Sequence, residues 1–492
     1  METKKIFVLG NGFDLAHYLP TAYIHFMEAM QVVENSHTSS ELGFDDLFKS
    51  RLDNEDWFLF RTKELYKTDE LILPVEVVDD LREKLKNNGW FQHFKRHLSD
   101  VDTWIDFETE IERVLNSISI ILQVQFQGNE INKEEHGSFR AILRQRIIQN
   151  PNLLDFNKDF FNQFGIHAKY YQQIFKNFKI FTTHYTIFDS TLKTENQCYV
   201  TSKNDYEKVE ASVRNFYTTF GKPIGRSIEK QEFNEIIDKS FLKHFSYDYI
   251  GFNESNIFKV LSKELKEFSE IFSDYISKFI NNFIPIKPFL PFGGISDKVE
   301  MVFTFNYSNS FQRFYASHQN KSDITRHLHG DAEKRNIVFG ISDLDESLKK
   351  YKIFEFVKTY QKIINNTDFQ FLDEKELEIK KLYDFATHNR LLTRGIKYVE
   401  PFKYEIIIWG HSLDISDREY IQELFALREE NREHNTFIKI YYHETSHSSL
   451  ANLMNIMGKE IIQKWIKNKW LIFEKSPDIY QIYQVHYKDK DA

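Results

Sequence analysis

Two residues in the second half of the chain, Asn306 and His329, have side chains suited to a hydrolytic site. Asn306 lies in VFTFNYSN (302–309) and His329 in RHLHGD (326–331). An amide can position a sugar hydroxyl or a water molecule, and an imidazole can accept a proton from either one. We therefore predict that Asn306 and His329 are catalytic. Taken singly, each also has a structural explanation, because Asn306 could cap a helix or shape a turn and His329 could be a satisfied core histidine. His327 would share a face with His329 on an extended strand, so spacing alone leaves open which histidine is the base.

A loop near the start of the chain has the residues to hold the phosphates of a nucleotide. Gly10 and Gly12 directly follow the apolar run IFVL (6–9), in a chain with only 17 glycines among 492 residues. Glycines let the backbone approach a pyrophosphate, and the helix that begins near Asp14 would direct its N–H groups at the anion. The predicted ligand-binding residues of this loop are Gly10, Asn11, Gly12, Phe13 and Asp14.

Short apolar runs with the character of buried strands precede these polar residues. In chain order they cover residues 6–9, 300–305, 337–339, 406–409, 438–442 and 470–473. Helical patterns lie between several of the runs, which predicts an α/β fold with a parallel sheet. Because ligands of an open α/β sheet gather at the carboxyl ends of its strands, we expect the polar segments to meet there.

Only the first of these runs lies before residue 295, and the intervening chain has a different pattern. Apolar residues from Ile257 to Phe283 recur every three or four positions, which predicts a long amphipathic helix. We predict a sequence-discontinuous core, a mostly helical insertion and a C-terminal tail, with boundaries at 1–30 plus 296–475, 31–295 and 476–492.

Composition excludes several classes of protein. With 64 Lys and Arg against 73 Asp and Glu, the net charge of −9 argues against broad nucleic-acid binding. The single cysteine, Cys198, excludes an internal disulfide and a cysteine-rich zinc site, and we expect no metal. Neither a signal peptide nor an apolar run of about 18 residues is evident, so we expect a cytoplasmic protein that does not enter membranes.

Five segments, taken together and in order, resemble known families. They are GNGFDLAHYLPTAY (10–23), TFNYS (304–308), LHG (328–330), VFG (338–340) and GHSL (410–413). Their order is similar to that of the NAD-binding core of the sirtuin-like fold. Their exact residues resemble those of the AbiH-type bacteriophage abortive infection family more closely. WIDFE (104–108) in the insertion also corresponds to the pattern of that family. The resemblance implies a sirtuin-like, Rossmann-type parallel sheet.

The same resemblance implies roles for particular residues. It places the pyrophosphate of NAD on the 10–14 loop and favours His329 as the base. It also places the adenosine ribose near the GHSL segment (410–413), at Gly410, His411 and Ser412, with Asp414 and Asp417 nearby. Tyr18, Tyr23 and Ser308 depart from the sirtuin pattern and the four-cysteine zinc module is missing, so protein deacylation is not expected.

Several other polar residues have ordinary structural explanations. Asp14, His17 and Asp343 are secondary candidates for which capping or solvent exposure is an equal alternative. Asp106 and Glu108 are two positions apart on a predicted helix, so they do not face the same way. We therefore favour a solvated helix face over a carboxylate pair for these two residues.

Cleavage of the nicotinamide–ribose bond of NAD passes through an oxocarbenium-like transition state. We expect an antiphage effector that hydrolyses NAD to nicotinamide and ADP-ribose, with the insertion holding activity off until a phage-derived or host trigger arrives. Assembly into a homo-oligomer is an expectation by analogy. The alternative is a module that senses NAD or ADP-ribose and signals through the insertion. A nuclease or transferase ranks last, because the chain lacks an acidic–lysine nuclease cluster.

Overall fold

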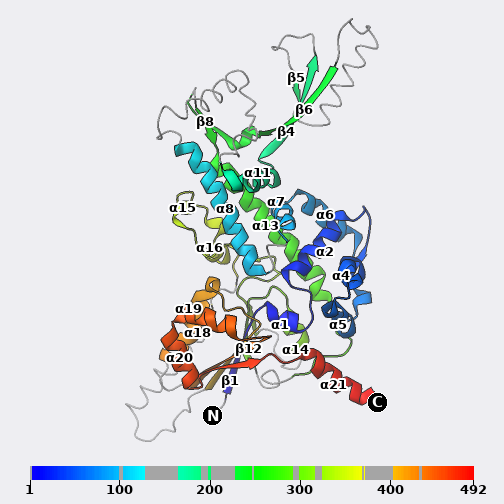
Figure 1. Cartoon of the computed structure of the whole chain (residues 1–492). Helices are drawn as coiled ribbons and strands as arrows, with labels where there is room; N and C mark the ends of the chain where they lie inside the picture. Colours follow the sequence, from blue (N-terminus) through cyan, green and yellow to red (C-terminus); the bar gives the residue numbers. More distant parts are fainter. Residues whose placement is uncertain are drawn as a thin grey trace.

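The fold is given by a computed structural model of the chain (Figure 1). The residues that it describes are 3–98, 103–127, 164–189, 198–200, 228–246, 249–291, 299–315, 324–367, 371, 403–430 and 435–491.

A six-stranded parallel sheet forms one part of the molecule. In the spatial order β10-β9-β1-β11-β12-β13, its strands are Thr325–His327, Val299–Thr304, Thr3–Leu9, Lys403–Trp409, Asn435–Tyr442 and Leu471–Lys475. β1 pairs with β9 on one side and β11 on the other, with Ile6 opposite Met301 and Ile406. The predicted α/β fold with a parallel sheet is confirmed, and residues 6–9 pair with strands from beyond residue 295.

Helices pack around the sheet and extend away from it (Figure 1). The described helices of the first half are α1 (Asn11–Ala16), α2 (Tyr23–Asn35), α3 (Phe44–Leu47), α4 (Lys49–Asp53), α5 (Trp57–Leu65), α6 (Val75–Asn87), α7 (Gly89–Arg96), α8 (Trp104–Gln127), α11 (Ala168–Asn177) and α13 (Glu254–Lys278). Those of the second half are α14 (Ser310–Tyr315), α15 (Glu346–Lys349), α16 (Lys358–Ile364), α18 (Arg418–Glu430), α19 (His447–Met457), α20 (Lys459–Lys467) and α21 (Ile479–Asp491). None of the described helices is both long and apolar enough to cross a membrane.

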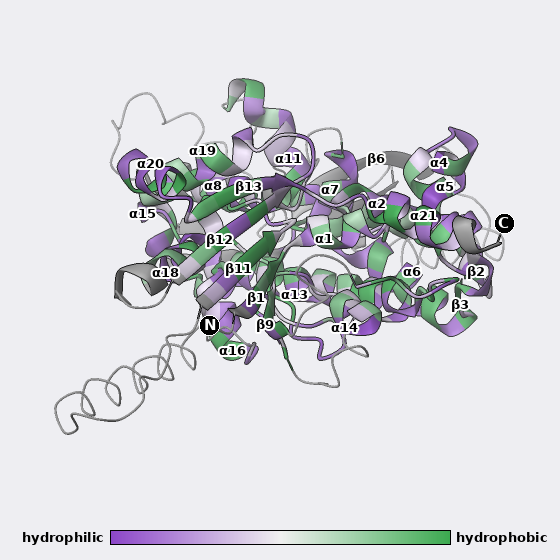
Figure 2. Cartoon of the chain, turned by 90° about the horizontal axis from the view of Figure 1, so that it is seen from below, coloured by the Kyte–Doolittle hydropathy of each residue, from purple (hydrophilic) through white to green (hydrophobic). Residues whose placement is uncertain are grey.

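Side chains of β1 alternate between two hydrophobic cores, as the period of a strand requires. Phe7 and Leu9 join the core that continues into the helices of the first half. Ile6 and Val8 join a second core, which is closed by apolar residues of α18, α19 and α20. Residues 6–9 and 406–409 are buried at every position, as strands covered on both faces of a sheet require, and the carboxyl-terminal part of β1 is green in Figure 2.

The predicted amphipathic helix beyond Ile257 is confirmed as α13. It begins after Asn253, whose side chain accepts a hydrogen bond from the Asn256 N–H. Phe268 of α13 stacks on Phe107 of α8, with ring centroids 5.6 Å apart. These two helices form a second body of structure beside the sheet (Figure 1).

Antiparallel strands occur between residues 31 and 295 as well as helices. They are β2 (Leu42–Gly43), β3 (Ile72–Leu73), β4 (Phe181–Asp189), β5 (Cys198–Val200), β6 (Ile228–Ile237), β7 (Leu242–Ser246) and β8 (Tyr249–Phe252). The domain boundaries near residues 30, 295 and 475 stay predictions.

The predicted strand over residues 337–339 is wrong. The Val338 N–H donates to the carbonyl of His329, and the Phe339 N–H donates to the side-chain amide of Gln361, each at 3.0 Å. These bonds satisfy the backbone without a neighbouring strand, so the apolar run is buried as an irregular segment. β10 is the sixth strand instead.

Candidate functional site

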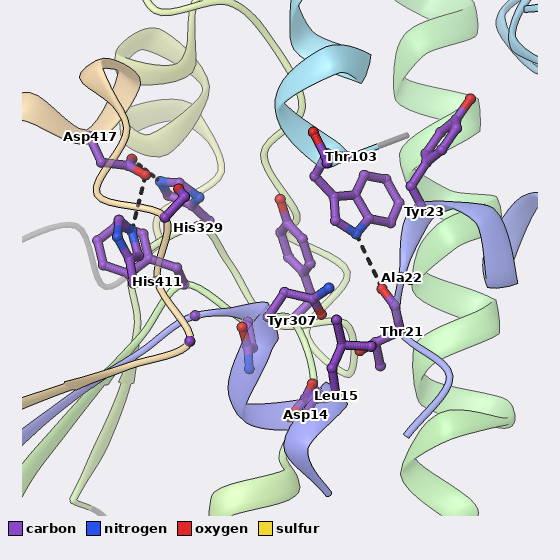
Figure 3. A pocket seen from close by; sticks show the side chains of 18 of the residues that line it. Asp14, Leu15, Thr21, Ala22, Tyr23, Thr103, Tyr307, His329, His411 and Asp417 are labelled. Atoms are coloured by element: carbon purple, nitrogen blue, oxygen red, sulfur yellow. Dashed lines mark hydrogen bonds and ion pairs between the residues drawn. The ribbon is translucent and has the colours of Figure 1, made fainter. Parts of the chain in front are cut away.

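A cavity of about 290 Å³ lies at the carboxyl ends of β1, β9, β10 and β11 (Figure 3). Predicted site residues that line it are Gly10, Asn11, Asp14, Asn306, His329, Gly410, His411 and Ser412. The opposite wall includes Trp104 and Glu108 of α8 and Phe272 of α13. The cavity therefore lies between the end of the sheet and the helices of the first half of the chain.

Asp417 lies between two histidines in this cavity (Figure 3). Its Oδ1 is 3.1 Å from His329 Nε2, and its Oδ2 is 3.2 Å from His411 Nε2. His411 Nδ1 accepts a hydrogen bond from the Leu413 N–H, so the proton of neutral His411 is on Nε2 and faces Asp417. The nearby carboxylate favours the proton of neutral His329 on the same nitrogen, although His329 Nε2 and Asp417 Oδ1 do not form a hydrogen bond of good geometry at 3.1 Å. Nδ1 of His329 is then the basic atom.

Burial sets the charge states of this group. It lowers the pKa of His329 to about 4, although Asp417 opposes the shift. Burial raises the pKa of Asp417, but His329, His411 and Lys358 outweigh burial and hold that pKa well below its usual range. At neutral pH a neutral imidazole therefore lies against an ionised carboxylate. In that state His329 can accept a proton, and Asp417 can stabilise the imidazolium that forms.

Asn306 follows β9 and is only 5% exposed. Among the described residues, neither its Oδ1 nor its Nδ2 makes a hydrogen bond of good geometry, although the amide lies near enough to Asp14 to help lower the pKa of that carboxyl group. An unsatisfied buried polar group costs about 1–3 kcal/mol, so a buried amide with two such atoms indicates a polar ligand or water in the cavity.

His327 and His329 have different surroundings. His327 Nδ1 donates to the backbone carbonyl of Asn306 at 3.1 Å, whereas the ring of His329 lines the cavity. β10 ends at His327 and a turn follows, so the two-residue alternation expected of a strand stops there. The structure thus places His329 at the cavity, whereas His327 forms a hydrogen bond with the backbone of Asn306.

The two N-terminal glycines allow close packing against a second loop. A Cβ at Gly12 would lie 2.6 Å from the Cα of Gly410, and one at Gly10 would lie 2.5 Å from the Gly410 carbonyl oxygen. The N–H groups of Gly10, Gly12 and Phe13 donate to the carbonyls of Trp409, Gly410 and Gly10. These three donors are therefore used within the protein and do not form the expected phosphate cradle.

Phe13 and Gly12 are not among the residues that line the cavity. The Phe13 ring is fully buried and packs edge-on against Trp409, with centroids 5.0 Å apart. Asp14 does reach the cavity, where its carboxylate accepts hydrogen bonds from the hydroxyls of Ser308, at 2.6 Å, and Ser310. Burial raises the pKa of Asp14, while these hydroxyls lower it. Ser308, a departure from the sirtuin pattern, is thus a partner of Asp14.

Glu108 is not on a solvated helix face, and that interpretation is corrected. Its Oε1 lies 2.5 Å from Lys358 Nζ at the cavity wall. Burial raises the pKa of Glu108 to about 7, although Lys358 lowers it. Asp106 has a different role, because it accepts hydrogen bonds from the N–H and hydroxyl of Thr103 and so caps α8.

The remaining secondary candidates lie outside the cavity. His17 is fully buried, and its ring nitrogens contact the Phe13 carbonyl and the Tyr315 hydroxyl at 2.7 Å each. Asp343 is exposed and accepts a hydrogen bond from the Leu344 N–H. Lys358, which sequence reasoning missed, is the first residue of α16 and has no motif around it.

A family model described as bacteriophage abortive infection AbiH matches residues 181–439, which is just over half of the chain. The matched range includes Asn306, His329 and Asp417, whereas the 10–14 loop and Glu108 lie outside it. No curated protein and no solved structure matches the chain.

Proposed function

Because the chain belongs to the AbiH family of bacteriophage abortive infection proteins, we propose that it acts in this defence by hydrolysing NAD to nicotinamide and ADP-ribose. The proposal rests on one observation: a group that can position a ligand and a group that can act as a base line the same cavity. The unsatisfied amide of Asn306 and the His329–Asp417 pair both line the space at the ends of the strands. A polar ligand there meets a positioning group and a base together.

The proposed reaction breaks the bond between the ribose C1′ and the nicotinamide nitrogen. The electron pair of that bond leaves with neutral nicotinamide, and a water oxygen bonds to C1′. Asn306 holds the ribose hydroxyl or the water through its unpartnered amide atoms. His329 Nδ1 takes the proton of the water and later releases it to solvent, while Asp417 stabilises the transient imidazolium.

The size and lining of the cavity are suited to binding one part of a dinucleotide. Ligand pockets usually measure about 300–1,000 Å³, so a cavity of about 290 Å³ suits one nucleoside half of NAD. Aromatic side chains of Trp104, Phe305 and Tyr307 line it and offer faces for a nicotinamide ring. The pyrophosphate and the second nucleoside would extend from the mouth.

The test is incubation of the purified full chain with NAD, with free nicotinamide measured by chromatography. A parallel incubation includes a lysate of phage-infected cells as the source of a trigger. We expect nicotinamide and ADP-ribose in equal amounts, and a loss of about 10²–10⁴-fold in rate for His329→Ala and for Asn306→Ala. Asp343→Ala is the matched control, because Asp343 is exposed outside the cavity.

Calorimetric binding of NAD to the same proteins separates the alternatives. Binding without nicotinamide release, with and without the lysate, would make the protein an NAD sensor. Absence of both binding and release would contradict the proposal.

A further inference from the structure

A compact set of metal-ligating side chains lies away from the cavity, between α7 and α8. His93 and His97 are four residues apart at the end of α7, and Glu110 is on α8. One ligand atom from each lies within 4.8 Å of the other two. His93 Nε2 is 2.7 Å from Glu110 Oε1, and the two imidazole centroids are 4.7 Å apart. We propose that His93, His97 and Glu110 bind a divalent transition-metal ion, with Zn²⁺ as the best match.

The ligand types and their spacing carry this assignment. Histidines at positions i and i+4 of a helix face the same side, and two imidazoles with one carboxylate form an established Zn²⁺ donor set. No cysteine is required for such a site. Ligand atoms around a tetrahedral Zn²⁺ lie roughly 3.3 Å apart, so the widest separation in the set has to shrink by up to about 1.5 Å while the His93–Glu110 contact of 2.7 Å opens. His97, which is partly exposed at the helix end, can make that movement.

Atoms around the three ligands are placed to support an ion. The side-chain amide of Asn177 lies 3.2 Å from His93 Nδ1, and rotation of that amide presents its oxygen to the Nδ1 proton when Nε2 binds the metal. Arg113 Nη1 lies 3.4 Å from Glu110 Oε2. Glu110 Oε1 is 2.7 Å from both His93 Nε2 and the Tyr170 hydroxyl, and it is the oxygen that would bind the metal in place of its contact with His93.

A bound ion would join α7 to α8, because the histidines come from one helix and the carboxylate from the other. α8 also carries Trp104 and Glu108 into the cavity wall. The metal would therefore fix the helix that forms one side of the cavity. This assignment does not depend on the identity of the ligand in the cavity.

The test uses the full chain stripped with EDTA, exchanged into metal-free buffer and titrated with ZnCl₂ by calorimetry. We expect one Zn²⁺ per chain, a higher melting temperature with the ion, and visible absorption of a tetrahedral site with Co²⁺. His97→Ala and Glu110→Gln should each weaken Zn²⁺ binding at least about 10-fold. His167→Ala should bind like the wild type, because His167 is exposed and outside the set. MgCl₂ should produce no response.

Metal analysis of the wild-type protein purified without a chelator provides a readout that needs no variant. About one zinc per chain supports the proposal. Failure of the stripped wild type to bind stoichiometrically would overturn it. So would His97→Ala and Glu110→Gln proteins that keep wild-type circular dichroism and bind Zn²⁺ as tightly as the wild type. The three residues would then be a hydrogen-bonded network only.

Discussion

Glu108 and Lys358 form an ion pair between two helices far apart in the sequence, with Oε1 and Nζ 2.5 Å apart. Lys358 is only 3% exposed, so its ammonium group has lost nearly all of its water. Burial lowers the pKa of Lys358, but Glu108 and Asp417 outweigh burial and raise it above its usual range. The lysine is therefore charged at neutral pH and depends on these two carboxylates. This pair joins α8 to α16 at the cavity.

Removal of the Glu108 carboxylate should destabilise the protein. Glu108→Gln leaves the buried ammonium of Lys358 without its nearest counter-charge, and we expect the free energy of unfolding to fall by about 3 kcal/mol. Urea unfolding followed by circular dichroism measures the change. The control is Glu346→Gln, whose pair with Lys349 is exposed and screened by solvent and should contribute far less to the free energy of unfolding. Equal effects of the two substitutions would contradict the prediction.

Asp417→Asn tests the tautomer assigned to His329. An amide does not hold the Nε2 proton or stabilise the imidazolium as a carboxylate does. If the proposed hydrolysis occurs, we expect kcat for nicotinamide release to fall about 10²–10⁴-fold with little change in KM for NAD. Asp343→Asn should retain the wild-type rate. A rise in KM at unchanged kcat would show that Asp417 serves binding instead.

The contact between the glycine loops predicts a loss of stability. Gly12→Ala places a Cβ 2.6 Å from the Gly410 Cα, in backbone that has little room to move. Overpacking of this kind costs about 1–3 kcal/mol, so the urea midpoint should fall even without NAD. Gly43→Ala is the comparison, since its nearest neighbour would be at an ordinary 3.5 Å. A Gly12→Ala protein as stable as Gly43→Ala would show that the loops separate easily.

The free energy of unfolding should decrease as the pH is lowered below about 6.5. Burial lowers the pKa of both His17 and His25 from 6.5 to about 4, with Arg51 and Asp56 making smaller, opposing contributions at His25. Between these values the unfolded chain binds more protons than the folded one. Each histidine should therefore remove up to about 1.4 kcal/mol of stability per pH unit as the pH falls.

Urea unfolding at pH 7, 6 and 5 measures this loss. His17→Gln should show a shallower dependence than the wild type, because one buried titrating group is gone. Identical slopes for the two proteins would show that His17 does not contribute.

The sequence predicts the centre of the parallel sheet well because β1 and β11 are buried on both faces over residues 6–9 and 406–409. The runs at 6–9 and 406–409 are apolar at every position, which few other structures require. β10 is not predicted, because Thr325–His327 is three residues long and all three of its side chains are polar. The run at 337–339 is equally apolar but is buried by packing under the Gln361 side chain, and no local pattern distinguishes that case.

Parts of the site that follow strands were predictable, and those that arrive from helices were not. Asn306, His329 and Gly410 lie where each strand ends, so topology alone brings them together. Lys358 reaches the cavity only because α16 packs with this lysine facing inward. Glu108 faces Lys358 for the same reason, although its own helix pattern suggested solvent. Such placements depend on long-range packing, which a single sequence does not encode at any one position.

The position of β1 between β9 and β11 has a consequence for biosynthesis. β1 has no partner in the sheet until residues near 300 and 403 have been made. At about 5–20 residues per second, the roughly 400 residues between β1 and the end of β11 take on the order of 20–80 s to synthesise. During that time the nascent chain has neither the sheet nor the Asp417 contact to His329. A chain that ends before Asp417 therefore lacks the contact between Asp417 and His329 and, with it, the complete candidate site.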